Sequence, residues 1–316
     1  MKPPIGFVLV THNNPDQTQF LCEQLTARFD RPPIVIHHDF SQTPLDPALF
    51  PANVTFVQEW LRTTWGGYSV VDAQLRALRI LYKKHSPDWF VVLSGADYPI
   101  NSPDFILGDL YGHDFDAYLD HRRIHYCRLP IPPEGFDDQN FISPAWVTLA
   151  FERYMAIGFG FFKLANFFKW KKKAIYLRSN FFIRRLTPFD GTLECHAGDH
   201  WLTGNRKVAD TLLDDSEVNR KLIAHFRRRP NPDEGFHQTV LCNAPGLKIS
   251  PDNKRFADWR GCTNHPRPLT EAEFPAILAS NDHFARKFLF NPEALRKLND
   301  SVDQKAKATS HHTKER

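Results

Sequence analysis

The chain has 316 residues, of which 42% are hydrophobic and 24% are charged. This composition is that of a folded globular protein, and it excludes extensive disorder. The formal net charge is only +4, a bias too small to predict a nucleic-acid partner. The length exceeds the roughly 100–200 residues of a typical domain, so we expect one large domain or two fused lobes.

Neither the N-terminus nor the cysteines predict export. The apolar run Gly6-Phe7-Val8-Leu9-Val10 is shorter than the roughly 7–15 residues of a signal peptide core and is typical of a buried strand. The five cysteines are an odd number and form no Cys-x-x-Cys pair: Cys22, Cys127, Cys195, Cys242 and Cys262. A disulfide framework and a zinc site are therefore not expected, and a reducing cytoplasm is the default location.

Strands and helices are predicted to alternate over the N-terminal third of the chain. Continuous apolar runs predict strands at residues 6–10, 33–37, 54–57 and 89–93. Apolar residues at helical spacing predict helices at residues 16–29 and 70–82. Alternation of this kind is typical of an α/β fold with a mostly parallel sheet.

After about residue 120 the pattern becomes irregular. Residues 128–145 are rich in Pro, Asp and Gly and are predicted to be a long loop, and residues 146–186 form an aromatic and basic insertion. Helices are again predicted near residues 205–213 and 234–242. The tail 299–316 has no apolar residue larger than Val302 and is predicted to be flexible.

Polar groups follow several of the predicted strands, at the positions where an open α/β sheet binds its ligands. These groups are Thr11-His12-Asn13, His37-His38-Asp39, Thr64-Trp65-Gly66-Gly67 and Ser94-Gly95-Ala96-Asp97. Asp and Asn also terminate strands for purely structural reasons, but these groups together favour a nucleotide-sized pocket. The sequence has no Gly-x-Gly-x-x-Gly motif and no P-loop, which argues against a dinucleotide dehydrogenase and a P-loop NTPase.

Several short blocks resemble, in order, those of one glycosyltransferase family. They are Thr64-Trp65-Gly66-Gly67-x-Ser69, Asp88 to Ile100, Asn231 to Leu241, Ala257-Asp258-Trp259-x-Gly261-Cys262, and Phe284-Ala285-Arg286-Lys287-Phe288. The family is that of the core-2/I-branching β-1,6-N-acetylglucosaminyltransferases and peptide O-xylosyltransferases, glycosyltransferase family 14. The resemblance covers about residues 5–290, and the blocks are specific as a set although each is short.

The resemblance implies an α/β GT-A fold, a glycosyltransferase fold in which a Rossmann-like lobe binds a UDP-sugar. Residues 1–298 would then form one catalytic domain, with the nucleotide-sugar lobe in residues 1–120 and the acceptor- and phosphate-binding half in residues 121–298. It also implies an inverting transfer of N-acetylglucosamine or xylose to a hydroxyl of a glycan or protein. The expected partners are therefore a UDP-sugar donor and a glycan or glycoconjugate acceptor.

A catalytic base is implied as well. In an inverting transfer, one carboxylate removes the proton of the acceptor hydroxyl as that oxygen attacks the anomeric carbon opposite the departing UDP. Glu234 occupies the matching position, and Asp233 beside it is the alternative. Without the family, Glu234 would be interpreted as a first-turn glutamate that stabilises the N-terminus of a helix.

The donor contacts that the resemblance implies fall into three groups. Asp39, Thr64 and Trp65 would hold the uridine and ribose, Asp97 would face the donor sugar, and Arg255, Arg286 and Lys287 would bind the diphosphate. Basic side chains can stabilise the charge on a departing diphosphate through charge-assisted hydrogen bonds. The alternative for these basic residues is an ordinary solvated surface.

No metal and no other cofactor is expected. Most GT-A enzymes hold a divalent metal with an Asp-x-Asp motif, but the corresponding Ala96-Asp97-Tyr98 keeps a single acid, which is a poor anchor for Mg²⁺ or Mn²⁺. The family it resembles is likewise metal-independent. Asp114-Phe115-Asp116 is a literal Asp-x-Asp, but it lies outside the matching block and is interpreted as a chance occurrence.

The sequence departs from the family pattern in one block. In Ala197-Gly198-Asp199-His200-Trp201 the acid is shifted by one position relative to the family's Gly-Ser-Asp-Trp, and His200 takes its place. A role of Asp199, His200 and Trp201 in recognising the acceptor or the donor sugar is therefore open. The chain is also expected to lack the disulfides and the anchor of the Golgi relatives, and on this expectation we interpret it as a bacterial-type member.

Residues 146–173 raise the question of membrane contact. Glu152, Arg153 and Lys163 interrupt the apolar residues, which argues against a membrane-spanning helix. Aromatic residues followed by Lys171-Lys172-Lys173 would suit an anionic surface such as the inner membrane; the alternative is a hydrophobic subdomain packed on the catalytic lobe. The rival to an enzyme is a non-catalytic protein of the same fold that binds glycans or a membrane surface.

Overall fold

The computed structural model describes residues 2–124, 150–155, 157–160, 174–177, 183, 185–260 and 265–314. The predicted loop at 128–145, most of the insertion at 146–186 and Lys171-Lys172-Lys173 lie outside the described residues. Within them, no helix is both long and apolar enough to cross a membrane.

The central sheet has seven strands and confirms the predicted α/β fold. Its order is β12 (Ile249–Ser250), β6 (Ala117–Leu119), β11 (Leu202–Asn205), β4 (Trp89–Ser94), β1 (Ile5–Thr11), β2 (Ile34–His38) and β3 (Val54–Phe56). The strands β4, β1, β2 and β3 are parallel, with Phe7 opposite both Ile34 and Val91. The exception is β11, which runs antiparallel to β4 and β6. The apolar runs of the N-terminal third therefore form a buried parallel sheet.

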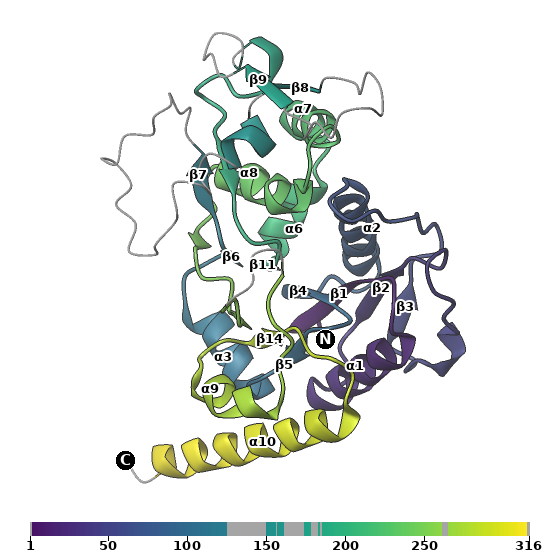
Figure 1. Cartoon of the computed structure of the whole chain (residues 1–316). Helices are drawn as coiled ribbons and strands as arrows, with labels where there is room; N and C mark the ends of the chain where they lie inside the picture. The colour runs from purple at the N-terminus through teal and green to yellow at the C-terminus, as the bar shows by residue number, and fades with distance from the viewer. Residues whose placement is uncertain are drawn as a thin grey trace.

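The two faces of this sheet bury different side chains because successive residues of a strand point to opposite sides. Val8 and Val35 pack with helix α2 (Ser69–Lys84), whereas Phe7 and Leu9 pack with helix α1 (Pro15–Arg28). Figure 1 shows α1 and α2 on opposite sides of the strands. Both helices were predicted from their apolar spacing. Because β1, β2 and β4 are parallel, their carboxyl ends meet at one edge of the sheet.

The second half of the chain adds helices and a small sheet around that edge. Its helices are α6 (Arg206–Leu213), α7 (Glu217–Phe226), the short turn η3 (Pro232–Glu234), α8 (Phe236–Cys242), η4 (Glu271–Glu273) and α9 (Phe274–Ala279). The small sheet has the order β13 (Arg255–Ala257), β14 (Phe284–Arg286) and β5 (Tyr98–Pro99). Because β5 directly follows the turn after β4, this sheet brings the Arg255 and Arg286 segments to the end of β4.

The remaining elements flank the two sheets. They are η1 (Pro47–Leu49), α3 (Pro103–Gly112), β7 (Arg122–Ile124), η2 (Phe151–Met155), β8 (Ile157–Gly160), β9 (Ala174–Leu177) and β10 (Cys195–Ala197). Among the cysteines of the described residues, Cys22, Cys195 and Cys242 are free thiols. The other two cysteines lie outside the described residues.

The tail after residue 298, which was predicted to be flexible, is helical as far as Lys314. Helix α10 (Pro292–Lys314) continues through this segment, drawn in yellow in Figure 1. Leu298 and Val302 are buried in the core that contains Phe7, and Asn299 Nδ2 donates to the hydroxyl of Tyr98 at 2.9 Å. Val302 continues the buried side of the helix that Leu295 and Leu298 begin, and a count of apolar residues does not reveal this spacing.

The Asp-x-Asp at residues 114–116 is used for structure. Asp116 is buried, and its carboxylate accepts hydrogen bonds from Asn205 Nδ2 at 2.8 Å and from the Lys248 backbone at 3.0 Å. Asp114 forms an ion pair with the Lys248 side chain. These contacts join β6, β11 and β12 at the edge of the sheet.

Candidate active site

The end of β4 is crowded on two sides. A Cβ atom at Gly95 would lie 2.7 Å from Thr18 Oγ1, so a glycine there allows α1 to approach the strand end. On the other side, the Phe288 backbone N–H donates to the Ala96 carbonyl at 2.9 Å. The segment that carries Arg286 and Lys287 is therefore fastened directly to the turn between β4 and β5.

Asp39 lies at the end of β2 and is fully buried. Its carboxylate accepts hydrogen bonds from Ser41 Oγ at 2.6 Å, from Gln42 Nε2 at 2.6 Å and from the Thr63 backbone at 2.7 Å. Burial opposes ionisation, but these hydrogen bonds outweigh it and lower the pKa of Asp39. Asp39 therefore holds the segment that leads into Thr64, and its carboxylate is already engaged by protein donors.

The loop at residues 64–67 connects this edge to the candidate base. Trp65 is 83% exposed, and Gly66 has a positive φ of 69°, which favours glycine. The Asn231 backbone N–H donates to the Gly66 carbonyl at 2.9 Å. Asn231 in turn donates from Nδ2 to Glu234 Oε1 at 3.2 Å. Asn231 therefore contacts both the backbone beside Trp65 and the carboxylate of Glu234.

Glu234 is held on one side and open on the other. Its Oε2 accepts a hydrogen bond from the Tyr154 hydroxyl at 2.6 Å and one from Arg153 at 3.4 Å, yet 37% of its side chain is exposed. Burial, and then the charge of Glu234, raise the pKa of Tyr154, so this phenol keeps its proton and acts as a donor. The geometry is that of a fixed, solvent-accessible carboxylate.

Asp233, the alternative base, is directed elsewhere. Its Oδ2 lies 3.0 Å from His200 Nδ1, and Gln74 Nε2 donates to His200 Nε2 at 2.8 Å. This pattern fits the histidine tautomer that carries its proton on Nδ1. Burial acts to raise the pKa of Asp233, but the contact with His200 prevails and lowers it. Asp233 therefore fixes the η3 turn rather than facing the opening beside Glu234.

Asp97 serves as a partner of Arg286. Its side chain is fully buried, its Oδ2 accepts from the Ser94 backbone at 2.6 Å, and its Oδ1 lies 3.4 Å from Arg286 Nε. Asp97 therefore helps to position Arg286, and its expected contact with the donor sugar stays a prediction. The Arg286 guanidinium also lies 4.0 Å from the ring centre of Trp201, a cation–π contact.

Arg255 is buried in the protein, and its expected contact with the diphosphate stays a prediction. It is 7% exposed and donates to the Asn253 carbonyl at 3.1 Å and to Thr203 Oγ1 at 3.2 Å. Its guanidinium also lies over the ring of Phe284, 4.8 Å from the ring centre. Burial lowers its pKa to about 10, so it remains a cation at neutral pH. Its charge lies behind Arg286 rather than at the surface.

Asp199 and Lys287 complete the charged groups. Asp199 accepts from Asn253 Nδ2 at 3.0 Å and from the His200 backbone at 2.8 Å; burial raises its pKa, with Arg286 and His200 opposing the shift. Lys287 is partly exposed, and its ammonium makes no ion pair with any acid of the described residues. Arg286 and Lys287 are therefore the basic groups best placed to meet an anionic ligand.

Sequence reasoning missed Arg153 and Tyr154 beside Glu234, and Gln74 beside His200. Arg153 and Tyr154 lie in the aromatic and basic insertion, where Arg153 had served only as an argument against a membrane span. Gln74 lies on the predicted helix at residues 70–82 with no feature to mark it. No metal site emerges either: the described residues contain no cluster of three or more His, Cys, Asp or Glu suited to a metal ion.

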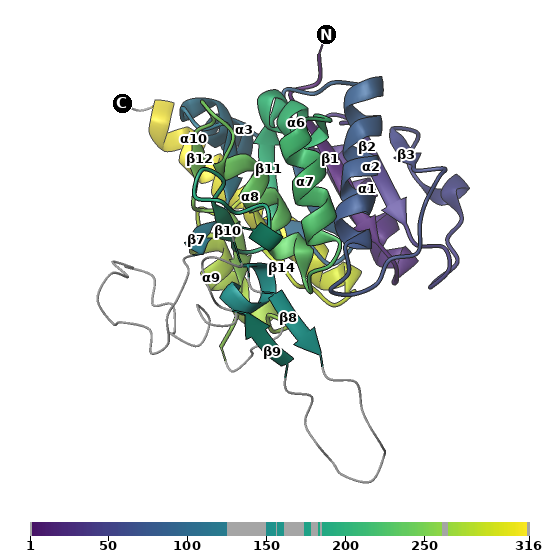
Figure 2. The same cartoon turned by 90° about the horizontal axis from the view of Figure 1, so that it is seen from above.

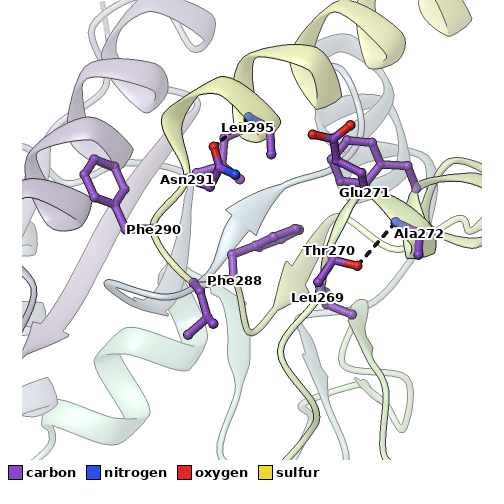
Figure 3. Close-up of a pocket in the computed structure, with 11 residues that line it drawn as sticks. Leu269, Thr270, Glu271, Ala272, Phe288, Phe290, Asn291 and Leu295 are labelled. Carbon is purple, nitrogen blue, oxygen red and sulfur yellow. Dashed lines mark hydrogen bonds between the residues drawn. The ribbon is translucent and has the colours of Figure 1, made fainter.

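A separate cavity of about 540 Å³ lies beyond Phe288, the residue after Lys287. Figure 3 shows Leu269, Phe288 and Leu295 among its walls. Its polar residues have local structural tasks: Thr270 forms a capping box with Glu273, and Asn291 Oδ1 accepts from the Ala294 backbone. The cavity is therefore lined mainly by apolar side chains, and the carboxylate of Glu271 in its wall is paired with Lys297 at 3.2 Å.

Relatives of this chain are glycosyltransferases. The β-glucuronosyltransferase GlcAT14A of Arabidopsis thaliana is 24% identical over 255 residues, covering 79% of this chain and 51% of the relative. GlcAT14B of the same plant is 25% identical over 289 residues, covering 85% and 59%. Xylosyltransferase 1 of Rattus norvegicus is 24% identical over 269 residues, covering 77% and 28%. The chain thus spans about half the length of the first two relatives.

These relatives come from a plant and a mammal, so a bacterial-type origin stays a prediction. The sequence profile named "Branch: Core-2/I-Branching enzyme" matches residues 5–117 and 163–282, which is most of the chain. The motifs, the α/β fold and this match agree, and the chain therefore belongs to the core-2/I-branching family of glycosyltransferases.

Proposed function

We propose that the protein transfers a sugar from a UDP-sugar to a hydroxyl group with inversion at the anomeric carbon. The observation that carries this proposal is the setting of Glu234, whose Oε2 is fixed by Tyr154 and Arg153 while 37% of the side chain stays exposed. A general base needs both features, since it must be oriented and must still reach the acceptor.

In the proposed step, Glu234 takes the proton of the acceptor hydroxyl, and the oxygen forms its bond to the anomeric carbon. The bond from that carbon to the β-phosphate oxygen breaks, and its electron pair leaves with UDP. Arg286 and Lys287 stabilise the negative charge that develops on the β-phosphate. They therefore interact more strongly with the transition state than with the ground state. Trp65 offers an exposed ring on which the uracil base can stack.

We further propose that the reaction needs no divalent metal. The single acid at the end of β4, Asp97, is buried, and its oxygens are already engaged by Ser94 and Arg286. A metal site at this position would have to displace Arg286, whose cation can supply the positive charge instead. Activity is therefore expected to survive excess EDTA.

The donor is proposed to be UDP-N-acetylglucosamine or UDP-xylose, and the glucuronosyltransferase relatives add UDP-glucuronate. The acceptor would be a glycan or glycoconjugate. Peripheral contact with an anionic membrane through residues 146–173, and a cytoplasmic location, stay predictions. The alternative function, a non-catalytic protein that binds glycans or a membrane surface with the same fold, predicts no turnover of any donor.

The test is UDP release from a panel of UDP-sugars, with and without EDTA, for the wild type and Glu234→Gln. We expect one donor to turn over, and the substitution to lower the rate by roughly 10²–10⁴-fold with UDP affinity unchanged. Glu217→Gln, at an exposed glutamate of α7, is the matched control. Activity of Glu234→Gln within a few-fold of wild type would reject the base, and restoration of EDTA-treated enzyme by Mn²⁺ would reject the metal-independent step.

A further inference from the structure

A groove of about 450 Å³ lies along α2 and the edge strand β3, separate from the candidate active site. Figure 2 shows β3 at the outer edge of the sheet, with α2 beside it. Residues of β3 and the segment after it, including Thr55 and Val57, line one side, and residues of α2 line the other. None of these residues takes part in the proposed transfer.

The α2 side of the groove is strongly basic. Arg76, Arg79, Lys83 and Lys84 all line it, because residues three, four and seven positions apart share one side of a helix. Arg76 is partly neutralised by Asp72 at 3.3 Å. Arg79, Lys83 and Lys84 are exposed and form no ion pair with an acid of the described residues.

The floor of the groove is apolar. Val57 is 3% exposed, and Ile80 packs against the same core from α2. Lysines in the last turn of a helix are common because they suit the helix dipole, but Arg79 lies outside that turn. A concave apolar floor below a cationic rim fits a ligand that combines flat, CH-rich faces with repeated negative charges.

The segment that lines one side of the groove continues along the chain to Trp65, in the candidate site. Arg76 NH1 donates to the Glu59 carbonyl at 2.7 Å, and Glu59 also lines the groove. The Leu61 backbone donates to His37 Nε2 at 3.1 Å, which fixes the same segment against β2. The next residues along the chain lead to Trp65, whose exposed ring can stack on a sugar or a base.

We propose that this groove binds the distal part of an anionic polysaccharide that serves as the acceptor, a chain that carries carboxylate or sulfate groups. This assignment rests on the proposed function, because it names the class of acceptor. The charge of Arg79, Lys83 and Lys84 supplies the complementarity, and the partly exposed side chain of Ile80 supports the sugar rings. An acidic polypeptide is the competing occupant.

Binding of fluorescent polygalacturonate, a carboxylate-bearing polysaccharide, tests the assignment without any turnover. Arg79→Glu/Lys83→Glu is compared with Arg228→Glu/Lys307→Glu, a pair at exposed positions outside the groove that changes the net charge equally. We expect the groove pair to weaken binding about tenfold, with the salt dependence reduced. The control pair should change binding less than about twofold, and thermal unfolding checks that both variants fold.

No binding by the wild type, equal losses in both variants, or competition by polyglutamate as strong as by unlabelled polygalacturonate would overturn the assignment. Titration of UDP keeps the two proposals apart. A protein that binds polygalacturonate in the groove but neither binds UDP nor turns over a UDP-sugar would refute the proposed function alone. A protein that transfers sugar but shows no groove-dependent binding would refute the groove alone.

Discussion

The hydroxyl of Tyr154 is the contact that most directly orients Glu234. Tyr154→Phe keeps the buried ring and removes only the 2.6 Å hydrogen bond. Hydrogen bonds to charged groups are worth about 1.5–3 kcal/mol, and the exposure of Glu234 places this one at the lower end. We expect kcat to fall about tenfold with UDP affinity unchanged, measured by UDP release and calorimetry.

Tyr82→Phe is the control for that substitution. Tyr82 is partly buried and packs on Phe90 far from the η3 turn, so loss of its hydroxyl should leave kcat unchanged. A Tyr154→Phe variant as active as the wild type would mean that Arg153 and Asn231 suffice to orient the base. A loss of UDP affinity in parallel with kcat would point to a general distortion of the site.

At the same scale, the sequence marked charged residues near the strand ends but did not reveal which protein groups each of them contacts. Asp39, Asp97 and Arg255 were all predicted to touch the donor, and all three are buried. Some of their partners are remote in the sequence: Asp39 accepts from Thr63, and Arg255 donates to the carbonyl of Val92. A motif can place a charged residue at a strand end, but it does not show which neighbours the fold brings to that charge.

At the scale of elements, the well-predicted parts are those with long patterns. Strands β1, β2 and β4 and helices α1 and α2 have apolar runs or helical periodicity over five or more residues, whereas the three-residue β3 was predicted from the short run at residues 54–57. The strands β5, β13 and β14 have only two or three residues each and pair across long sequence separations. Segments that short carry no periodicity, so the small sheet that holds Arg286 was not predictable from local pattern.

The pair of Asp109 and His283 joins α3 to the small sheet. Asp109 Oδ2 lies 2.9 Å from His283 Nε2, and His283 is fully buried. The hydrogen bond from His283 lowers the pKa of Asp109 from 3.8 to about 2, with burial opposing the shift. Burial lowers the pKa of His283, so the ring is neutral and donates from Nε2 at neutral pH.

A carboxyl group whose pKa is lower in the folded state stabilises the fold at any pH above its unfolded-state pKa. This stabilisation is lost as the pH falls through the folded-state pKa. Asp109→Asn should therefore reduce the free energy of unfolding by roughly 2 kcal/mol at pH 7. The difference from wild type should shrink between about pH 4 and pH 2. Urea unfolding across this range measures it, with Asp104→Asn, an exposed position of the same helix, as the control. A difference independent of pH would exclude the carboxylate as its source.

At the scale of the whole molecule, the two halves of the chain share their structural core. Strands β11 and β12 from the second half lie in the same sheet as β1 and β4. Helix α10 then returns to the first half, where Asn299 contacts Tyr98 and Gln24, and Asp303 forms an ion pair with Arg28 at 2.8 Å. Elements that interleave in this way cannot unfold separately without exposing shared apolar surface.

Leu298→Ala tests whether α10 contributes to this shared core. Leu298 is buried, and it packs in the same hydrophobic cluster as Phe7 and Leu21. Removal of a buried leucine side chain costs about 2–5 kcal/mol through lost burial and the cavity left behind. We expect one cooperative unfolding transition in the wild type and in the variant, shifted to lower urea in the variant by that free energy. Lys307→Ala, at an exposed position of the same helix, should leave the midpoint unchanged. Two separated transitions, or a Leu298→Ala midpoint equal to wild type, would show that α10 is an appendage and that the halves fold independently.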